Sequence, residues 1–168
     1  MQYVSHYFST MGELLLTSDG EALTGLSFKG EETIPVPVQS ACPEEVRIPA
    51  FEQTKRWLDV YFTGRDPGIL PPVRLQGTPF REAVWQILLT IPYGTTVTYG
   101  EIAGRIAQEK KRARMSAQAV GGAVGHNPIP ILVPCHRVIG SDGSLTGYSA
   151  GIRRKEYLLK LEKISWKR

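Results

Sequence analysis

The sequence predicts an α+β fold with two domains: a small N-terminal α/β domain with an antiparallel sheet, and a mostly helical C-terminal domain with a helix-turn-helix of winged-helix-like form. Short alternating apolar runs separated by turn residues fill the first thirty positions, a pattern typical of an antiparallel meander. Apolar residues at helical spacing, preceded by capping residues, recur from residue 76 onward. The 168 residues suit two small domains, which we place at 1–75 and 76–168.

The N-terminal domain is expected to hold three strands followed by one helix. Residues 29–49 contain four prolines and predict a loop, after which Pro49 begins a helix that Gly64 ends. Residues 67–72 predict a linker. The expected strands are Tyr3 to Phe8, Glu13 to Thr17 and, after a Ser-Asp-Gly turn, Ala22 to Phe28. No residue of this half points to chemistry, so we interpret it as a scaffold.

Capping patterns predict the helices of the C-terminal domain. Thr78 can cap a helix that has Pro79 at its first position. Thr98 and Glu101 form a capping box for a second helix, and Ser116 can cap a third. Two helices joined by a turn predict a helix-turn-helix, whose second helix normally enters a DNA groove.

The second helix of this pair is unusual because its side chains are small. Gly121 and Gly122 are adjacent, and a glycine inside a helix costs roughly 0.5 to 1 kcal/mol relative to alanine. Two explanations fit these residues equally: a tight crossing with another helix, or close approach of DNA that is contacted without base specificity.

Charge is distributed unevenly along the chain. Residues 1–75 carry 6 Lys and Arg against 10 Asp and Glu, a net charge of −4, whereas residues 76–168 carry 14 against 6, a net charge of +8, with a basic run at 105–114. The positive charge of the second half is suited to binding a polyanion such as nucleic acid. Charged side chains on solvent-exposed helix faces explain the same distribution. The sequence has no apolar run of membrane-spanning length and no signal-peptide layout, which predicts a cytoplasmic protein without a membrane partner.

The residues most suggestive of chemistry are Cys135 and His136, in the run Pro-Cys-His-Arg-Val that follows an apolar segment, 129–133, expected to form a strand. A thiol is a strong nucleophile as thiolate, and an adjacent imidazole or a cation such as Arg137 can lower its pKa. The plain alternative is a buried cysteine at the end of a core strand, beside a histidine with ordinary partners. The second cysteine, Cys42, lies in a context typical of an exposed loop. The scattered Cys and His residues predict no metal site.

Around this pair the sequence resembles the O(6)-alkylguanine-DNA alkyltransferase family. The resemblance covers residues 78–162, and the Pro-Cys-His-Arg-Val core is highly specific. The other shared features are Asn127-Pro128, a Gly-rich loop ending in Gly147-Tyr148, a basic helix ending in Glu162, and the stretches Gly94 to Ala103 and Ala119 to Ala123.

The resemblance implies direct-reversal DNA repair. An alkyl group, usually methyl, would move irreversibly from O6 of guanine in double-stranded DNA to the Cys135 thiolate, with O4 of thymine as a further candidate. The nucleotide must be flipped out, because its reacting atom is buried in the base stack. His136, oriented by Glu162, would take the thiol proton. Because a thioether is not readily cleaved, each molecule would react once, as a monomer and without a cofactor.

The resemblance also assigns roles to further residues. Asn127 would brace the connection into the active-site segment, and Tyr99 would contact a phosphate, rotate the base and donate a proton to the departing guanine. Gln118 stands where many relatives carry the arginine that fills the gap left by the flipped base. The helix that ends at Glu162 is expected to pack inward through Tyr157, Leu158 and Leu161. The residues expected to contact DNA are Tyr99, Ala117, Gln118, Ala119, Gly121, Gly122 and Arg137. Those expected to line the substrate pocket are Val124, Pro130, Val138, Tyr148 and Ser149.

Two other functions stay open. A non-catalytic DNA-binding sensor of alkyl damage, similar to the alkyltransferase-like proteins, would replace the acceptor cysteine, which is present here as Cys135. A thiol hydrolase could use Cys135 and His136, but it would have no use for a basic helix pair. Turnover on a soluble ester would distinguish a hydrolase from a protein that transfers an alkyl group once.

Overall fold

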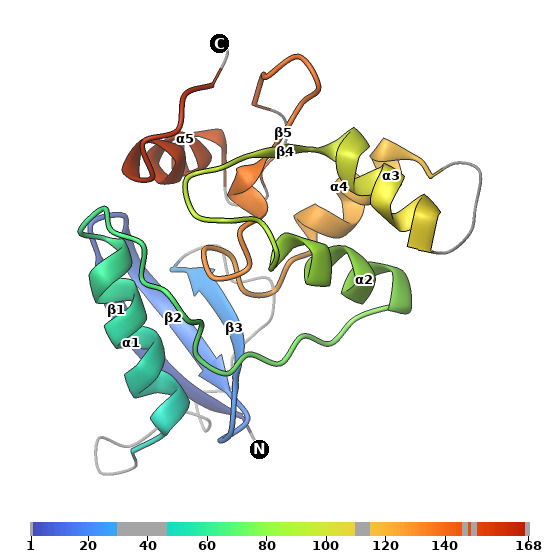
Figure 1. Ribbon diagram of the computed structural model, residues 1–168. Coiled ribbons are helices and arrows are strands. Elements are labelled where there is room, and N and C mark those ends of the chain that lie inside the picture. Colours follow the sequence, from blue (N-terminus) through green and yellow to red (C-terminus); the bar gives the residue numbers. More distant parts are fainter. Residues whose placement is uncertain (1, 30–46, 110–114, 146–147, 149–150, 167–168) are drawn as a thin grey trace. The chain divides into compact units, whose positions relative to one another are not determined.

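The computed structural model describes residues 2–29, 47–109, 115–145, 148 and 151–166. The chain forms two compact units, Met1–Leu75 and Gln76–Arg168, and each is described by itself. An antiparallel sheet belongs to the first unit and most of the helices belong to the second (Figure 1), so the predicted α+β class is confirmed. Within the described segments, no helix combines the length and apolar character that crossing a membrane requires.

Three strands and one helix build the first unit. The strands pair antiparallel in the order β1 (Tyr3–Ser9), β2 (Gly12–Ser18) and β3 (Leu23–Phe28), close to the predicted bounds. Successive side chains of a strand point to opposite faces, so Leu14 and Leu16 of β2 lie on the same face of the sheet, and both are buried. The helix α1 (Pro49–Tyr61) begins at the predicted proline and packs against β2 and β3 (Figure 1), with Leu58 fully buried.

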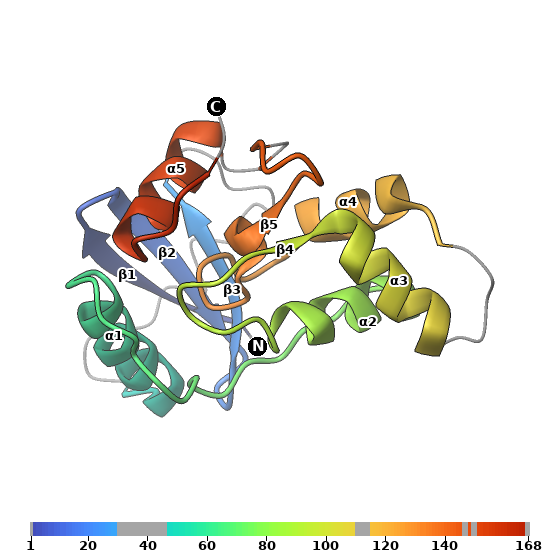
Figure 2. The same ribbon diagram turned by 45° about the horizontal axis from the view of Figure 1, so that its top comes forward.

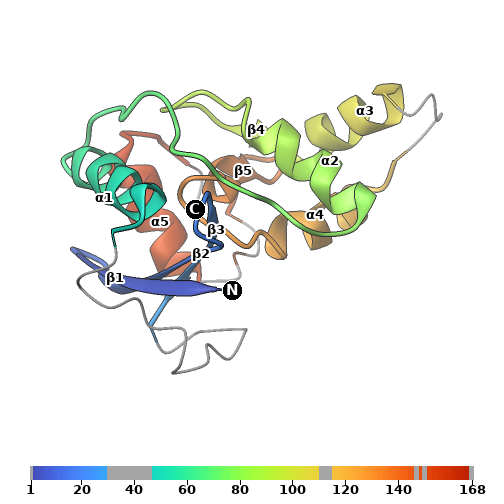
Figure 3. The same cartoon turned by 90° about the horizontal axis from the view of Figure 1, so that it is seen from below.

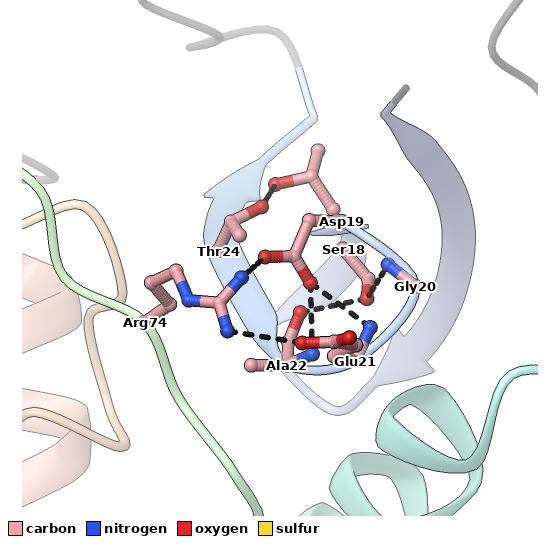
Figure 4. Close-up of polar contacts among 8 residues, drawn as sticks. Ser18, Asp19, Gly20, Glu21, Ala22, Thr24 and Arg74 are labelled. Atoms are coloured by element: carbon pink, nitrogen blue, oxygen red, sulfur yellow. Dashed lines mark hydrogen bonds and ion pairs between the residues drawn. The ribbon is translucent and has the colours of Figure 1, made fainter.

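Side chains close the turn between β2 and β3. Asp19 accepts hydrogen bonds from the backbone N–H groups of Glu21 and Ala22, each at 2.9 Å (Figure 4). Arg74 forms ion pairs with Asp19 and, at 3.2 Å, with Glu21. The backbone N–H of Arg74 also donates to the carbonyl of Leu23 at 2.8 Å. The chain that follows the predicted linker is therefore attached to β3.

The second unit is mainly helical. Its elements are α2 (Pro79–Leu88), β4 (Val97–Thr98), α3 (Tyr99–Glu109), α4 (Ala117–Gly125), the 3-10 turn η2 (Cys135–Arg137), β5 (Val138–Ile139) and α5 (Ile152–Leu161). The side chains of Thr78, Thr98 and Ser116 each accept backbone N–H groups of the helix that follows, so all three predicted caps are confirmed. The helices α2, α3 and α4 pack on one another (Figure 3), while β4 and β5 form a parallel pair between α5 and the α3–α4 pair (Figure 2).

The prediction of a strand over 129–133 is wrong, because this apolar segment forms a mostly buried turn. The N–H of Val133 donates to the carbonyl of Ile129 at 3.0 Å, and Ile131 has a φ of 76°, which is uncommon for a β-branched residue. Three prolines lie in or beside the segment. Proline cannot donate a hydrogen bond to a strand neighbour, which explains why apolar character alone does not make this segment a strand.

The predicted inner face of α5 is partly wrong. Leu158 is fully buried as expected, but Tyr157 is exposed and Leu161 is only half-buried. Lys155 and Leu159 are fully buried instead. Positions 155, 158 and 159 have the i, i+3, i+4 spacing of one helix face, so the lysine occupies a place that an apolar residue would normally take.

Gly77 provides a test of packing in the second unit. A Cβ added at Gly77 would lie 2.6 Å from the ring of Trp85, and that ring is held because its Nε1 donates to the carbonyl of Ala123 at 2.9 Å. Gly77→Ala should therefore lower the free energy of unfolding by about 1 to 3 kcal/mol, the usual cost of overpacking a filled site. Urea unfolding of the purified protein measures the change.

Gly104 is the matched control, because it lies inside α3 with nothing within 4 Å of an added Cβ. Gly104→Ala should raise the free energy of unfolding by roughly 0.5 to 1 kcal/mol, the difference in helix propensity. Equal effects of the two substitutions would contradict the packing described for Trp85.

Candidate active site

Cys135 begins the 3-10 turn η2, directly after the buried turn 129–133. Its N–H donates to the carbonyl of Val133 at 2.8 Å, and the residue is 3% exposed. The thiol is therefore held on a short, constrained segment inside the second unit.

The environment of the Cys135 sulfur sets its protonation state. Burial raises the pKa of the Cys135 thiol, whereas the Asn127 side chain, the Lys155 ammonium and the Tyr148 hydroxyl each act to lower it. The net direction is upward, so the sulfur rests as a thiol and must give up a proton before it attacks. Burial, and next the neighbouring Cys135, raise the pKa of Tyr148 well above its usual value, so this hydroxyl keeps its proton.

His136 and Glu162 form a buried pair behind the thiol. Both side chains have zero exposure, and His136 Nε2 donates to Glu162 Oε2 at 2.5 Å. Burial lowers the pKa of His136 although Glu162 acts in the opposite direction, so the imidazole is neutral at neutral pH and able to accept a proton. Burial would raise the pKa of Glu162, but the hydrogen bonds from His136 and Arg137 outweigh it and bring that pKa to about 2. The carboxylate is thus ionised.

Arg137 was expected to contact DNA, and the structure places it inside instead. Its guanidinium side chain is 8% exposed, its Nε donates to Glu162 at 2.8 Å, and a terminal nitrogen donates to the carbonyl of Ile91 at 2.8 Å. It also lies over the ring of Tyr93, 5.6 Å from the centroid. Arg137 thus holds the Glu162 carboxylate in place. The positive charge of the guanidinium is paired with Glu162 and not with the Cys135 thiol.

Asn127 joins the end of α4 to the turn before Cys135. Its Nδ2 donates to the carbonyl of Val133 at 2.7 Å, and its Oδ1 accepts the N–H of Ile129 at 2.9 Å. One amide therefore satisfies a backbone group at each end of the turn. The geometry agrees with a bracing role.

The helix α4 presents most of its predicted contact residues on one open face. Ala117, Gln118, Ala119 and Gly122 are exposed, and Gly121 is half-buried. An added Cβ at Gly121 would lie 3.9 Å from the Tyr99 ring, an ordinary contact, and at Gly122 it would meet nothing. A tight crossing with another helix is therefore not the reason for the paired glycines. Residues 110–114 of the basic run at 105–114 lie outside the described residues.

The predicted pocket residues lie in the same unit, with different exposures. Val124, Val138 and Tyr148 are buried, and Pro130 is half-buried. Ser149 lies outside the described residues.

Lys155 is the site residue that the sequence interpretation missed. Its side chain is fully buried, its Nζ donates to the carbonyl of Val138 at 2.6 Å, and its charge acts on Cys135. A signal was present in the sequence: Lys155 interrupts an apolar face at helical spacing with Leu158 and Leu159. A charged residue on the inner face of a helix needs a polar partner, and here the carbonyl of Val138 is one.

Comparisons with known proteins agree along the whole chain. Residues 2–74 match the family model "6-O-methylguanine DNA methyltransferase, ribonuclease-like domain", and residues 79–164 match "6-O-methylguanine DNA methyltransferase, DNA binding domain". A methylated-DNA–protein-cysteine methyltransferase of Haemophilus influenzae is 41% identical over 98% of this chain and 88% of its own. One of Methanosarcina acetivorans is 44% identical over 95% of this chain and 97% of its own.

Solved structures give the same result. The crystal structure of Mycobacterium tuberculosis OGT in complex with DNA superposes with a TM-score of 0.82 and 43% identity, covering 96% of this chain and 92% of that one. Likeness of sequence and of fold thus extends over both units, and the chain belongs to the 6-O-methylguanine DNA methyltransferase family.

Proposed function

We propose that this protein repairs alkylated double-stranded DNA by moving an alkyl group from O6 of guanine to the sulfur of Cys135. One observation carries the proposal: a buried thiol is followed directly by a neutral imidazole that is hydrogen-bonded to an ionised, buried carboxylate. This is the arrangement of a nucleophile, a base and an orienting acid.

The reaction divides into proton transfer and displacement. His136 takes the thiol proton, through a water molecule, and the resulting imidazolium is stabilised by Glu162. The Cys135 thiolate then attacks the alkyl carbon, so that an S–C bond forms and the C–O6 bond breaks. The bonding electron pair leaves with O6, and guanine becomes neutral by taking a proton, for which the Tyr99 hydroxyl is the proposed donor. Because the thioether is stable, the protein is consumed.

The helix-turn-helix would hold the DNA so that the alkylated base can reach the sulfur. O6 of guanine is not accessible to a buried thiol while the base is stacked, so the nucleotide must flip into the pocket. The open, small-residue face of α4 suits close contact with DNA of any sequence, through Ala117, Ala119, Gly121 and Gly122, and Gln118 would stand in the gap that the base leaves. Val124, Pro130, Val138, Tyr148 and Ser149 would surround the flipped base.

The two units would have different tasks. Residues 76–168 hold the proposed DNA-binding face and the acceptor, with Asn127 keeping the segment before Cys135 in shape. Residues 1–75 would serve as a scaffold. The protein is further proposed to act in the cytoplasm and as a monomer.

The first test concerns the acceptor. Mixing the protein with a methylated duplex oligonucleotide should add the mass of one methyl group per molecule, and peptide mapping should place it on Cys135. Cys135→Ser should abolish the gain, whereas Cys42→Ser should leave it unchanged. A methyl group found on Cys42, or several transfers by one protein molecule, would contradict the proposal.

The second test concerns His136 and Glu162 as a unit. His136→Gln and Glu162→Gln should each slow methyl transfer by about 10²-fold or more, the usual contribution of a positioned base. The double variant should lose little more than the slower single variant, because groups that act together are not additive. Glu156→Gln on the same helix is the control and should react at the normal rate. Losses that multiply, with folding and DNA affinity intact, would show that the two residues act separately.

The third test concerns Gln118. An arginine adds a cation and a stacking plane that glutamine lacks, so Gln118→Arg should tighten binding to methylated duplex by about 1 kcal/mol, a fraction of the few kcal/mol that unstacking a base costs. Gln118→Ala should weaken it. Neither variant should change the rate with free O6-methylguanine, which has no stack to fill. A change in the free-base rate as large as that with duplex would instead assign residue 118 to the pocket.

A further inference from the structure

Lys163 has a backbone conformation that is uncommon for its residue type. Its φ is 62°, in the left-handed region that favours glycine and is costly for most other residues. Among the described residues, Lys163 and Ile131 are the two non-glycine residues with a positive φ. Ile131 lies in the turn before Cys135, and Lys163 directly follows Glu162. Both disfavoured conformations therefore lie beside segments of the candidate active site, and strain at such places often contributes to function.

The hydrogen bonds at the end of α5 show what the conformation of Lys163 does. The N–H of Ile164 donates to the carbonyl of Leu159, and the N–H of Lys163 donates to the carbonyl of Lys160, each at 2.9 Å. These two bonds form a Schellman motif, in which one left-handed residue reverses the chain and satisfies the last carbonyls of a helix. Glycine is the usual residue at the left-handed position, but a lysine occupies it here. The helix is thus ended by a residue under backbone strain.

The position at which α5 ends matters for the site, because the C-cap residue of this helix is Glu162. Its carboxylate accepts hydrogen bonds from His136 at 2.5 Å, Arg137 at 2.8 Å and the backbone N–H of Gly94 at 3.0 Å. All three donors belong to other segments of the second unit, so they fix where the carboxylate must lie. If the left-handed turn opened, the last carbonyls of α5 would lose their partners and the backbone of Glu162 would be free to move.

We propose that Lys163 is a positioning residue for the reaction: by holding the left-handed conformation that ends α5, it fixes the backbone of Glu162 and keeps the carboxylate against the His136 imidazole. The inference rests on the proposed function and deepens it, because Lys163 acts through Glu162 on the base that takes the thiol proton. The effect of a substitution at residue 163 should therefore follow how well the new residue tolerates a positive φ. The charge of the side chain should not decide it.

The test is a set of substitutions in the full-length protein. Lys163→Ile introduces a β-branched side chain that strongly disfavours a positive φ, whereas Lys163→Gly and Lys163→Asn remove the charge and tolerate that φ. The methyl-transfer rate of Lys163→Ile should fall about tenfold, a part of the 10²-fold or more that a positioned base contributes. The Gly and Asn variants should keep the natural rate. Lys160→Ile is the control and should also keep it, because it makes the same exchange of side chains at an exposed position within the helix.

An NMR measurement reports on the contact itself. The proton in the short, charge-assisted bond between His136 Nε2 and Glu162 Oε2 should give a downfield signal in the natural protein. This signal should weaken or move upfield in Lys163→Ile and stay unchanged in Lys163→Gly and Lys160→Ile. An unchanged signal in a folded Lys163→Ile protein, whatever its transfer rate, would overturn the inference. If the natural protein accepted no methyl group, the proposed function would be refuted, while the NMR signal would still report on Lys163.

A stability measurement covers the case in which Lys163→Ile does not fold. Lys163→Gly relieves the strain, so its urea midpoint should be higher than that of the natural protein. The His136 Nε2 proton should also exchange with solvent more slowly, because the end of α5 opens less often. Lys160→Gly is the matched control and should lower the midpoint, since glycine is unfavourable inside a helix. A midpoint for Lys163→Gly no higher than the natural one would contradict the role given to Lys163.

Discussion

The buried carboxylate of Glu162 is the group on which the second unit depends most. It closes the end of α5, and it accepts hydrogen bonds from His136 at 2.5 Å, from Arg137 at 2.8 Å and from the backbone N–H of Gly94 at 3.0 Å. An ionised carboxylate inside a protein is tolerated only when such partners replace water. The loop before β4, the turn η2 and the last helix are thus joined at one point. The same contact that orients the imidazole also holds these segments in place.

A second constraint acts on the segment before the thiol. The turn 129–133 is apolar and mostly buried, so its backbone groups must find partners without water, and the Asn127 amide supplies two of them. The positive φ of Ile131 is held by this arrangement. Cys135 is therefore placed by a polar side chain outside its own segment, and its position does not depend on a regular strand.

The sequence alone predicted most of the local structure, because its signals are local. Thr78, Thr98 and Ser116 cap the helices that follow them, and short apolar runs separated by turn residues predicted the sheet. The strand expected over 129–133 is the main failure. This run has the apolar composition of a strand, but the prolines in and beside it remove backbone donors that a strand needs, and that local signal outweighs the apolar character.

The candidate site was predicted unevenly, because its contacts join residues that lie far apart in the sequence. Cys135, His136 and Glu162 were identified by a resemblance to a family, and the contact between the last two joins residues 26 positions apart. Arg137 was expected to contact DNA, and its burial against Glu162 was not foreseen because that contact joins residues 25 positions apart. The burial of Lys155 was missed because the Val138 carbonyl that accepts its hydrogen bond lies on another element, and only the interrupted apolar face of α5 pointed to it.

The separation of Cys135 from Glu162 along the chain also matters during synthesis. A ribosome makes the N-terminal end first, at roughly 5 to 20 residues per second, so Cys135 and His136 are made before α5 and Glu162. Until α5 docks, the His136 imidazole lacks the carboxylate that orients it. The proposed reactive arrangement around Cys135 is therefore complete only when the last helix of the fold is in place.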